Sequence, residues 1–221
     1  YFEPIYATAG SILAHVNKHC VVWGSGVIVQ DQPVKPAKFL AVRGPKTRNC
    51  LLKQGHSVPE VYGDPGLLLP LYYSPNIDKK YTIGIIPHYN DYKSVVAEYA
   101  SEARLCIIDL MTNDIESTTD EILACEYIVS SSLHGIIIAH AYGIPAVWTP
   151  FSDRPFGDGI KFQDYFASVN LQYPEEFNFK SKTINEWANL LNEAPFALPE
   201  QAVVKQRQRD LLDTFPLKIQ P

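Results

Sequence analysis

In the second half of the chain, short and almost continuous apolar runs alternate with segments that have the periodicity of helices. The apolar runs predict four buried strands, at 81–87, 105–110, 127–131 and 144–148. The intervening segments predict three helices, at 91–103 with Asp91 as N-cap, from a capping box at 118–121, and at 134–142. Apolar strands that alternate with helices are typical of a parallel sheet covered on both faces. We therefore expect 81–148 to form a four-stranded parallel sheet.

The first half of the chain shows the same alternation less completely. Strands are expected at 20–26, at 38–44 and within 59–66, and helices at 9–19 and 45–55. The predicted fold class is α/β, with two Rossmann-like halves that each contain a parallel sheet. The predicted domains are 1–72 as the N-terminal half, 73–80 as a linker, and 81–221 as a C-terminal domain that ends in helices at 183–192 and 200–215.

Composition and charge narrow the classes of protein to which the chain can belong. Its 221 residues, 46% hydrophobic and 19% charged, suffice for one large or two small globular domains. The net charge of −5 argues against a nucleic-acid partner, because such proteins usually carry a basic face. No apolar run is long enough to span a bilayer. The four cysteines lack metal-ligand spacing, so we expect no metal site, and buried free thiols in a reducing cytosol are favoured over a disulfide.

Polar residues gather where the predicted strand 127–131 becomes the predicted helix 134–142. Backbone N–H groups and the helix dipole at this helix start favour a bound anion, and Gly135 lets a ligand approach the backbone. His134 would lie in the first helical turn, where an imidazole that titrates near neutral pH can act as acid or base. The candidate anion ligands of this turn are Ser131, Ser132 and Gly135. The alternative is that the serines only cap the helix.

A second group of cations surrounds the start of the predicted helix 45–55. Arg43, Lys46 and Arg48 lie within one turn of this start, where cations oppose the helix dipole. An anion bound between them would remove the conflict. The alternative is that all three are solvated surface charges.

The remaining candidates follow other predicted strands, at the edge of the sheets where α/β proteins bind ligands. Gly24 and Ser25 belong to a glycine turn after one strand, and His88 follows another. Asp109 also ends a strand, and is interpreted as a base or as a cap of the loop after it. The chain has no complete dinucleotide fingerprint and no Walker loop. Several cations, two histidines and a few carboxylates suit a small, multiply charged anion held in a cleft.

Five segments, in this order along the chain, resemble the polysaccharide pyruvyl transferase family. They are CVVWGSGVI, FLAVRGPKTRNCLLKQG, VYGDPGLLLP, IGIIPHYND and ILACEYIVSSSLHGIIIAHAYGIPAVW. The segment KFQDYFAS also fits the region after the last core strand, so the resemblance extends from about Ala9 to Ser168. The order of the motifs is specific, whereas each motif by itself is weak.

The resemblance implies an enzyme that transfers a pyruvyl group from phosphoenolpyruvate to a sugar and forms a pyruvate ketal. It implies a fold similar to the B-type glycosyltransferases, with Arg43 and the pair Leu133–His134 in contact with phosphoenolpyruvate, and no cofactor beyond this donor substrate. The acceptor would be a glycan or lipid-linked sugar of exopolysaccharide or capsule biosynthesis in the cell envelope. The enzyme would then be cytoplasmic and could reach the inner face of the membrane through its acceptor.

The chain departs from the family pattern in two respects. Some members carry arginine directly before the Leu-His pair, where this chain has Ser132. That contact is then absent, or is replaced by Arg48, Lys46 or His88. Members are usually longer at the amino end, so the N-terminal half is expected to be incomplete. Asp109, Asp64 and Asp91 are candidates for the base on the acceptor side. The alternative functions are a B-type glycosyltransferase that uses a sugar nucleotide, and a non-catalytic module that binds an anion or a glycan.

Overall fold

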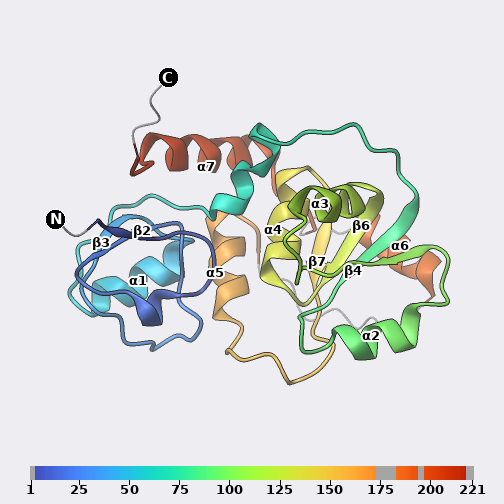
Figure 1. Cartoon of the computed structure of the whole chain (residues 1–221), viewed down its shortest axis with the longest axis horizontal. Coiled ribbons are helices and arrows are strands. Elements are labelled where there is room, and N and C mark those ends of the chain that lie inside the picture. Colours follow the sequence, from blue (N-terminus) through green and yellow to red (C-terminus); the bar gives the residue numbers. More distant parts are fainter. Residues whose placement is uncertain (1–2, 173–182, 194–196, 218–221) are drawn as a thin grey trace. The chain divides into compact units, whose positions relative to one another are not determined.

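The computed structural model describes residues 3–172, 183–193 and 197–217 of the chain (Figure 1). The chain forms two compact units, each built from separate segments. The first unit comprises 1–68, 157–173 and 200–221, and the second comprises 69–156 and 174–199. Each unit contains one sheet of parallel strands, which confirms the predicted α/β fold class.

The sheet of the second unit has four parallel strands in the order β5-β4-β6-β7. The strands are β4 (Tyr81–Ile86), β5 (Leu105–Ile107), β6 (Cys125–Ser130) and β7 (Ala146–Trp148). The helices of this unit are α2 (Tyr92–Tyr99), α3 (Ile115–Leu123), α4 (Leu133–Ala141) and α6 (Ile184–Glu193). The four-stranded parallel sheet predicted over 81–148 is therefore confirmed.

Helices cover both faces of this sheet (Figure 1). Ile85 of β4 shares a hydrophobic cluster with Val95 of α2 and Trp187 of α6, so these two helices cover one face. Because side chains alternate along a strand, the next residue, Ile86, points to the opposite face. Gly135 of α4 packs directly against Ile86, and α3 packs beside α4 on this face.

The order of the strands reverses between β4 and β6. From β4 the chain adds β5 on one side, and then crosses to the other side of β4 to add β6 and β7. The loops that leave β4 and β6 therefore diverge at the carboxyl ends of these strands. Such a switch point is where open α/β sheets bind their ligands.

The sheet of the first unit has three parallel strands in the order β1-β2-β3. Its elements are β1 (Ile5–Ala7), β2 (Cys20–Trp23), β3 (Lys38–Ala41), α1 (Pro45–Lys53), α5 (Ile160–Ser168) and α7 (Gln201–Asp213). Val22 of β2 and Leu51 of α1 share the larger hydrophobic cluster of this unit with Ile160 of α5. The next strand residue, Trp23, packs with Leu211 of α7 and donates its indole N–H to the Leu211 carbonyl at 3.0 Å.

The helix predicted at 9–19 is wrong. This segment contains only a single 3₁₀ turn, Leu13–His15, and Gly10 has a φ of +95°, which is incompatible with a right-handed helix. Leu13 and Val16 are buried and reach the core from a loop. Their spacing of three residues imitated one turn of an amphipathic helix.

The strand predicted within 59–66 is also wrong, because this segment forms only one bridge, between Val42 and Tyr62. Among the strands and α-helices, two elements were not predicted. The edge strand β1 is three residues long, and α5 begins after a loop rich in glycine and proline. A strand of three residues is too short to show an alternating apolar pattern, and the loop before α5 hides where the helical pattern begins.

One predicted helix start needs correction, and one predicted cap residue makes other contacts. The helix expected from the capping box at 118–121 begins earlier, because Asp114 Oδ1 accepts a hydrogen bond of 3.0 Å from Ser117 N–H and caps α3 instead. Asp91 precedes α2 as expected, but its side chain makes no capping hydrogen bond within the described residues. It contacts Ser152 and Arg154 of the loop after β7 instead.

The division into units differs from the domains expected from the sequence in its later segments. The prediction assigned the whole of 81–221 to the C-terminal domain, whereas the segments that carry α5 and α7 belong to the first unit. The boundary between units after Leu68 also precedes the predicted linker at 73–80. The reason is that α5 and α7 bury their apolar residues against β2, β3 and α1.

Three observations bear on chemistry elsewhere in the chain. None of the helices formed by the described residues is both long enough and apolar enough to cross a bilayer. The same residues include no cluster of histidine, cysteine or carboxylate side chains arranged to hold a metal ion. All four cysteines are free thiols, and three of them are buried.

Candidate functional site

The turn between β6 and α4 is tied to the end of β4 by its serines. Ser130 is completely buried, and its hydroxyl donates to the Ile86 carbonyl and accepts from Ser132 N–H, at 2.8 and 3.0 Å. Ser131 is also buried, and its Oγ accepts a hydrogen bond of 2.7 Å from His88 N–H. These bonds lie at the switch point between β4 and β6 and fix its two diverging loops to each other.

The N-terminus of α4 lies at this switch point without a side-chain cap. Ser132 occupies the N-cap position in an extended conformation, but its hydroxyl makes no capping bond within the described chain. The alternative that the serines only cap the helix is therefore not what the structure shows. The positive end of the helix dipole, which has no side-chain cap here, suits an anion.

Leu133 and Gly135 hold this helix start against the sheet. Leu133 is buried, with 5% of its surface exposed. A Cβ on Gly135 would lie 2.6 Å from Ser130 Oγ and 2.9 Å from Ile86 Cγ2, so only glycine allows α4 to approach the strands this closely. The structure thus gives Gly135 a packing role, and its expected contact with a ligand stays a prediction.

Two histidines lie in the two loops of the switch point. His134 is the second residue of α4 and is half-buried. His88, also half-buried, follows β4, and its Nδ1 accepts from Asn90 N–H at 3.3 Å. In the neutral imidazole this bond leaves the ring proton on Nε2, so His88 can donate from Nε2. The ring also packs on Tyr89, with centroids 4.2 Å apart.

The loop after β7 adds a cation that sequence reasoning missed. Arg154 is exposed over 56% of its side chain, and its Nη2 lies 3.1 Å from Oδ1 of the completely buried Asp91. Its Nη2 also donates to Ser94 Oγ at 3.1 Å, and its Nε donates to Ser152 Oγ at 3.2 Å. The only sequence signal was the place of Arg154 directly after the last strand of the sheet. β7 pairs with β6, so this loop borders the turn that carries His134.

Asp109 lies at the same edge of the sheet but beyond β4, on the side away from β6. It follows β5, and its Oδ1 accepts from Met111 N–H at 2.8 Å, which makes it a cap of its own loop. Its charge also contributes to raised pKa values of Tyr92 and Glu121, in both cases after the larger effect of burial. The structure therefore supports the alternative that Asp109 caps a loop, and its role as a base stays a prediction.

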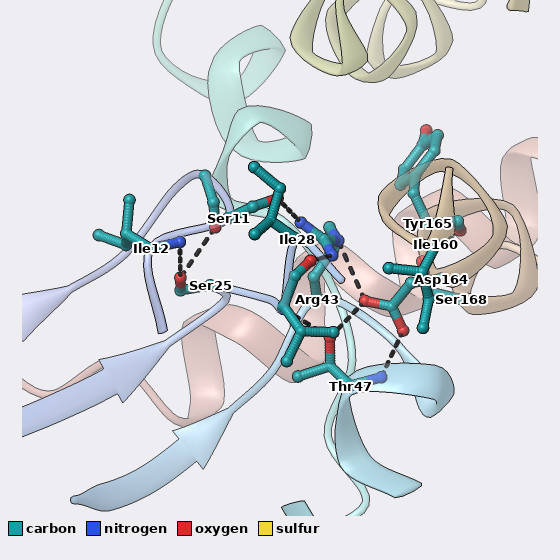
Figure 2. A network of polar contacts seen from close by, with 12 residues as sticks. Ser11, Ile12, Ser25, Ile28, Arg43, Thr47, Ile160, Asp164, Tyr165 and Ser168 are labelled. Atoms are coloured by element: carbon teal, nitrogen blue, oxygen red, sulfur yellow. Dashed lines mark hydrogen bonds and ion pairs between the residues drawn. The ribbon is translucent and has the colours of Figure 1, made fainter. Parts of the chain in front are cut away.

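Arg43 of the first unit is completely buried in a polar network (Figure 2). Its Nε donates to Asp164 Oδ2 at 3.0 Å, its Nη1 to Ser11 Oγ at 2.6 Å, and its Nη2 to the Val27 carbonyl at 2.7 Å. Asp164 of α5 also accepts from the backbone N–H and hydroxyl of Thr47, at 2.9 and 2.6 Å. The guanidinium thus links α5 to the turns that follow β2 and β3.

Gly24 and Ser25 lie in the turn beside this network. Gly24 has a φ of +98°, and a Cβ there would lie 2.4 Å from Pro65, so the position requires glycine. Ser25 is completely buried and donates its hydroxyl to the Gly10 carbonyl at 2.8 Å. Its backbone carbonyl accepts from Arg43 N–H at 3.1 Å. Both residues build the turn itself, and their contact with a substrate stays a prediction.

Lys46 and Arg48 lie on α1 and do not share one position. Lys46 is exposed and lines a pocket of about 490 Å³ in the first unit, together with Asp31, Lys53 and several amide side chains. Arg48 donates from Nε to the Val58 carbonyl at 3.2 Å. The expected cluster of three cations around one anion is therefore not found here, because Arg43 is buried and paired with Asp164.

Most of the predicted site residues form two separate groups, one in each unit. The second unit gathers one group at its switch point, which consists of His88, Ser131, Ser132, Leu133, His134 and Gly135. The first unit gathers another around its strand ends, which consists of Gly24, Ser25 and Arg43. The group at the switch point of the second unit combines a helix start that has no side-chain cap with two half-buried histidines. This group, with Arg154, is the candidate functional site.

Comparisons with known proteins identify one family to which the chain is similar. The family model for polysaccharide pyruvyl transferase matches residues 5–153 of the chain. The chain is 33% identical over 204 residues to an uncharacterized protein of Acanthamoeba polyphaga mimivirus, and the match covers 85% of this chain and 70% of the viral protein. No solved structure matches the chain significantly.

Proposed function

Because the chain belongs to the polysaccharide pyruvyl transferase family, we propose that it transfers a pyruvyl group from phosphoenolpyruvate to a glycan and forms a pyruvate ketal. The family supports pyruvyl transfer to a polysaccharide in general terms. We propose further that phosphoenolpyruvate is the donor, that the product is a ketal, and that residues of the switch point catalyse the reaction. The observation that carries it is the N-terminus of α4, which has no side-chain cap and lies at the switch point whose two loops carry His88 and His134.

Phosphoenolpyruvate suits this site because it carries a phosphate and a carboxylate close together. The first-turn amides of α4 would bind one of these groups, as helix N-termini bind phosphate. Arg154 would bind the other through its free edge, since a planar guanidinium matches the two oxygens of a carboxylate or phosphate. Ser132, whose hydroxyl does not cap the helix, can donate to the same anion. Arg154 then replaces the arginine that is absent at position 132.

The reaction needs one proton on carbon and two new carbon–oxygen bonds. Protonation of the methylene carbon of phosphoenolpyruvate turns it into a methyl group and makes the neighbouring carbon electrophilic. One sugar hydroxyl adds to that carbon, and the carbon–phosphate oxygen bond breaks as a second hydroxyl of the same sugar adds. Of the two hydroxyl protons, one replaces the proton given to carbon and the other leaves with inorganic phosphate. The products are the cyclic pyruvate ketal and phosphate.

His134 is the proposed acid that protonates the methylene carbon and is then recharged from the sugar hydroxyl. It lies in the first turn of the helix whose N-terminus would hold the donor, so its backbone is fixed relative to the bound anion. Imidazole exchanges protons near neutral pH, as this role requires. His88, with its proton on Nε2, is the proposed donor of a hydrogen bond to the phosphate that leaves.

The test is incubation of the protein with phosphoenolpyruvate and a lipid-linked or synthetic glycoside, with phosphate release and product mass as readouts. We expect His134→Asn to lower turnover by about 10²–10⁴ while the circular dichroism spectrum is unchanged. His15→Asn is the matched control, because His15 is an exposed histidine of the first unit. A rise in KM at unchanged turnover would leave His134 a binding role only. Activity with a sugar nucleotide in place of phosphoenolpyruvate would establish the glycosyltransferase alternative.

A further inference from the structure

A completely buried carboxylate lies at the edge of the candidate site. Asp91 Oδ1 accepts a hydrogen bond of 2.5 Å from Ser152 Oγ and lies 3.1 Å from Arg154 Nη2. The other oxygen, Oδ2, is also buried and has no hydrogen-bond partner among the described residues. A buried carboxylate that is only partly compensated lowers the stability of a protein, so its presence calls for a reason other than stability.

The usual reason for an aspartate at this position does not apply. Asp91 immediately precedes α2, where aspartate commonly caps the helix through its side chain. Here the side chain makes no such bond within the described residues, and the carboxylate turns to the loop after β7. Its backbone N–H still closes the β4 turn by donating to the His88 carbonyl at 2.7 Å. The residue therefore connects the loop that carries His88 to the loop that carries Arg154.

The contacts of Arg154 fix one edge of its guanidinium and leave the other edge available. Nε donates to Ser152, and Nη2 donates to Ser94 and faces Asp91. Nη1 makes no hydrogen bond or ion pair with any residue that the structure describes. Ser152 reinforces the arrangement, because its hydroxyl donates to Asp91 while its oxygen accepts from Arg154 N–H and Nε–H. An exposed arginine held in this way loses little freedom when an anion binds.

We propose that Asp91 is a positioning residue of the donor site, which holds Arg154 ready to receive the phosphate or carboxylate of the donor. The identity of the anion rests on the proposed function, whereas the bracing of Arg154 does not. Asp91 itself does not touch the substrate, because it is completely buried. The backbone N–H of Asp91 donates to the His88 carbonyl, and the His88 N–H donates to Ser131. These two bonds join the braced arginine to the start of α4.

The bracing is tested first in the protein without ligand. Side-chain ¹⁵N relaxation of the arginine Nε–H groups reports whether each guanidinium is held or mobile on the picosecond to nanosecond timescale. We expect Arg154 Nε–H to be rigid in the wild type and mobile in Asp91→Asn and in Ser152→Ala. Ser152→Ala is a second route to the same result, because it removes the bridging hydroxyl and keeps the buried carboxylate. An Arg154 that is mobile in the wild type, or equally rigid in both variants, would overturn the proposal.

The consequence for binding is tested by calorimetric titration of the full chain with phosphoenolpyruvate, and separately with inorganic phosphate. We expect Asp91→Asn to weaken phosphoenolpyruvate binding about tenfold, the effect of one weakened charge-assisted contact. Arg154→Ala should weaken binding at least as much, and the double variant should bind no more weakly than Arg154→Ala. Arg104→Ala, at the amino end of β5, is the control and should bind like the wild type, because Arg104 contacts Thr82 and Asn185.

The two measurements distinguish failure of the Asp91–Arg154 bracing from failure of the proposed donor site. Losses that add in the double variant, or unchanged binding by a folded Asp91→Asn, would show that Asp91 does not act through Arg154. A wild-type protein that binds neither anion would refute the proposed donor site, and the relaxation measurement would still decide whether Asp91 positions Arg154.

Discussion

Arg43 and Asp91 are both charged, completely buried residues that follow strands, but they differ in where their partners lie. The partners of Arg43 come from three segments of the first unit, and its ion-pair partner Asp164 is buried as completely as Arg43 itself. The ion-pair partner of Asp91 is an arginine with a largely exposed side chain. The first arrangement holds helix α5 in the fold, and the second holds a side chain at the surface.

The network around Arg43 predicts a large loss of stability when the arginine is removed. Arg43→Ala leaves the buried Asp164 carboxylate without its cation, which should lower the free energy of unfolding by about 3–5 kcal/mol in urea titrations. Asp164→Asn in the same variant should recover part of this loss, because the remaining buried group is then neutral. The comparison pair is Arg207–Asp210, whose side chains are half-buried at 20% and 26% exposed, and Asp210→Ala should change stability by about 0–1 kcal/mol. Equal effects at the two pairs would contradict the structural role of Arg43.

His140 predicts a loss of stability in acid. Burial lowers the pKa of His140 to about 4, while its ring lies 2.9 Å from the Ala197 carbonyl. As the pH falls below about 6.5, the unfolded state takes up a proton that the folded state does not take up until about pH 4. The wild type should therefore lose about 3 kcal/mol of stability to this group between these pH values. His140→Gln keeps a donor of similar reach but does not titrate. The pH dependence of its urea midpoint should be shallower than that of the wild type, and an identical slope would contradict the prediction.

At the scale of elements, the sequence predicted those parts whose signal is local. The strands of the second unit are apolar on both faces, and α4 is a long apolar run that begins after three serines, so both were predictable. The sequence placed His88 and the Ser131 turn after predicted strands at one edge of the sheet, and the structure joins them by a hydrogen bond. The pairing of Asp91 with Ser152 was not predictable, because it joins residues 61 positions apart through the packing of two loops. Asp91 looked like a helix cap because cap propensity ignores such distant partners.

At the start of α4, replacing Gly135 by alanine should lower stability, although alanine has the higher helix propensity. In an isolated helix, Gly135→Ala would stabilise by about 1 kcal/mol. Here the new methyl group would lie 2.6 Å from Ser130 Oγ and 2.9 Å from Ile86, and both of these neighbours are buried. We expect a net loss of about 1–3 kcal/mol, measured by urea unfolding, because α4 must move away from the strands. A stabilised variant would show that α4 does not pack this closely on β6.

At the scale of the whole molecule, the chain returns to its first unit after it has built the sheet of the second. The segments that return carry α5, which bears Asp164, and α7, which bears Leu211. Leu211 is completely buried against Trp23, and Gln208 donates to the Leu67 carbonyl at 2.7 Å. A piece of the chain that contains only the first 68 residues would therefore lack part of its core. The first unit depends on residues of α7, whereas the hydrophobic cluster of the second unit contains none of them.

This dependence predicts what happens when α7 is removed. A chain that ends after residue 199 loses Leu211 and exposes the face of β2 that carries Trp23, while every segment of the second unit is retained. Hydrogen exchange followed by mass spectrometry should show that peptides from β2 and β3 lose protection and that peptides from β4 and β6 keep it, because local stability follows buried apolar contact. A chain that ends after Pro216 is the control, since it keeps α7 and the edge-to-face contact of Phe215 with Trp23, whose centroids are 5.0 Å apart. Protection lost equally from both sheets, or from neither, would mean that the two units do not derive their stability from the segments assigned to them.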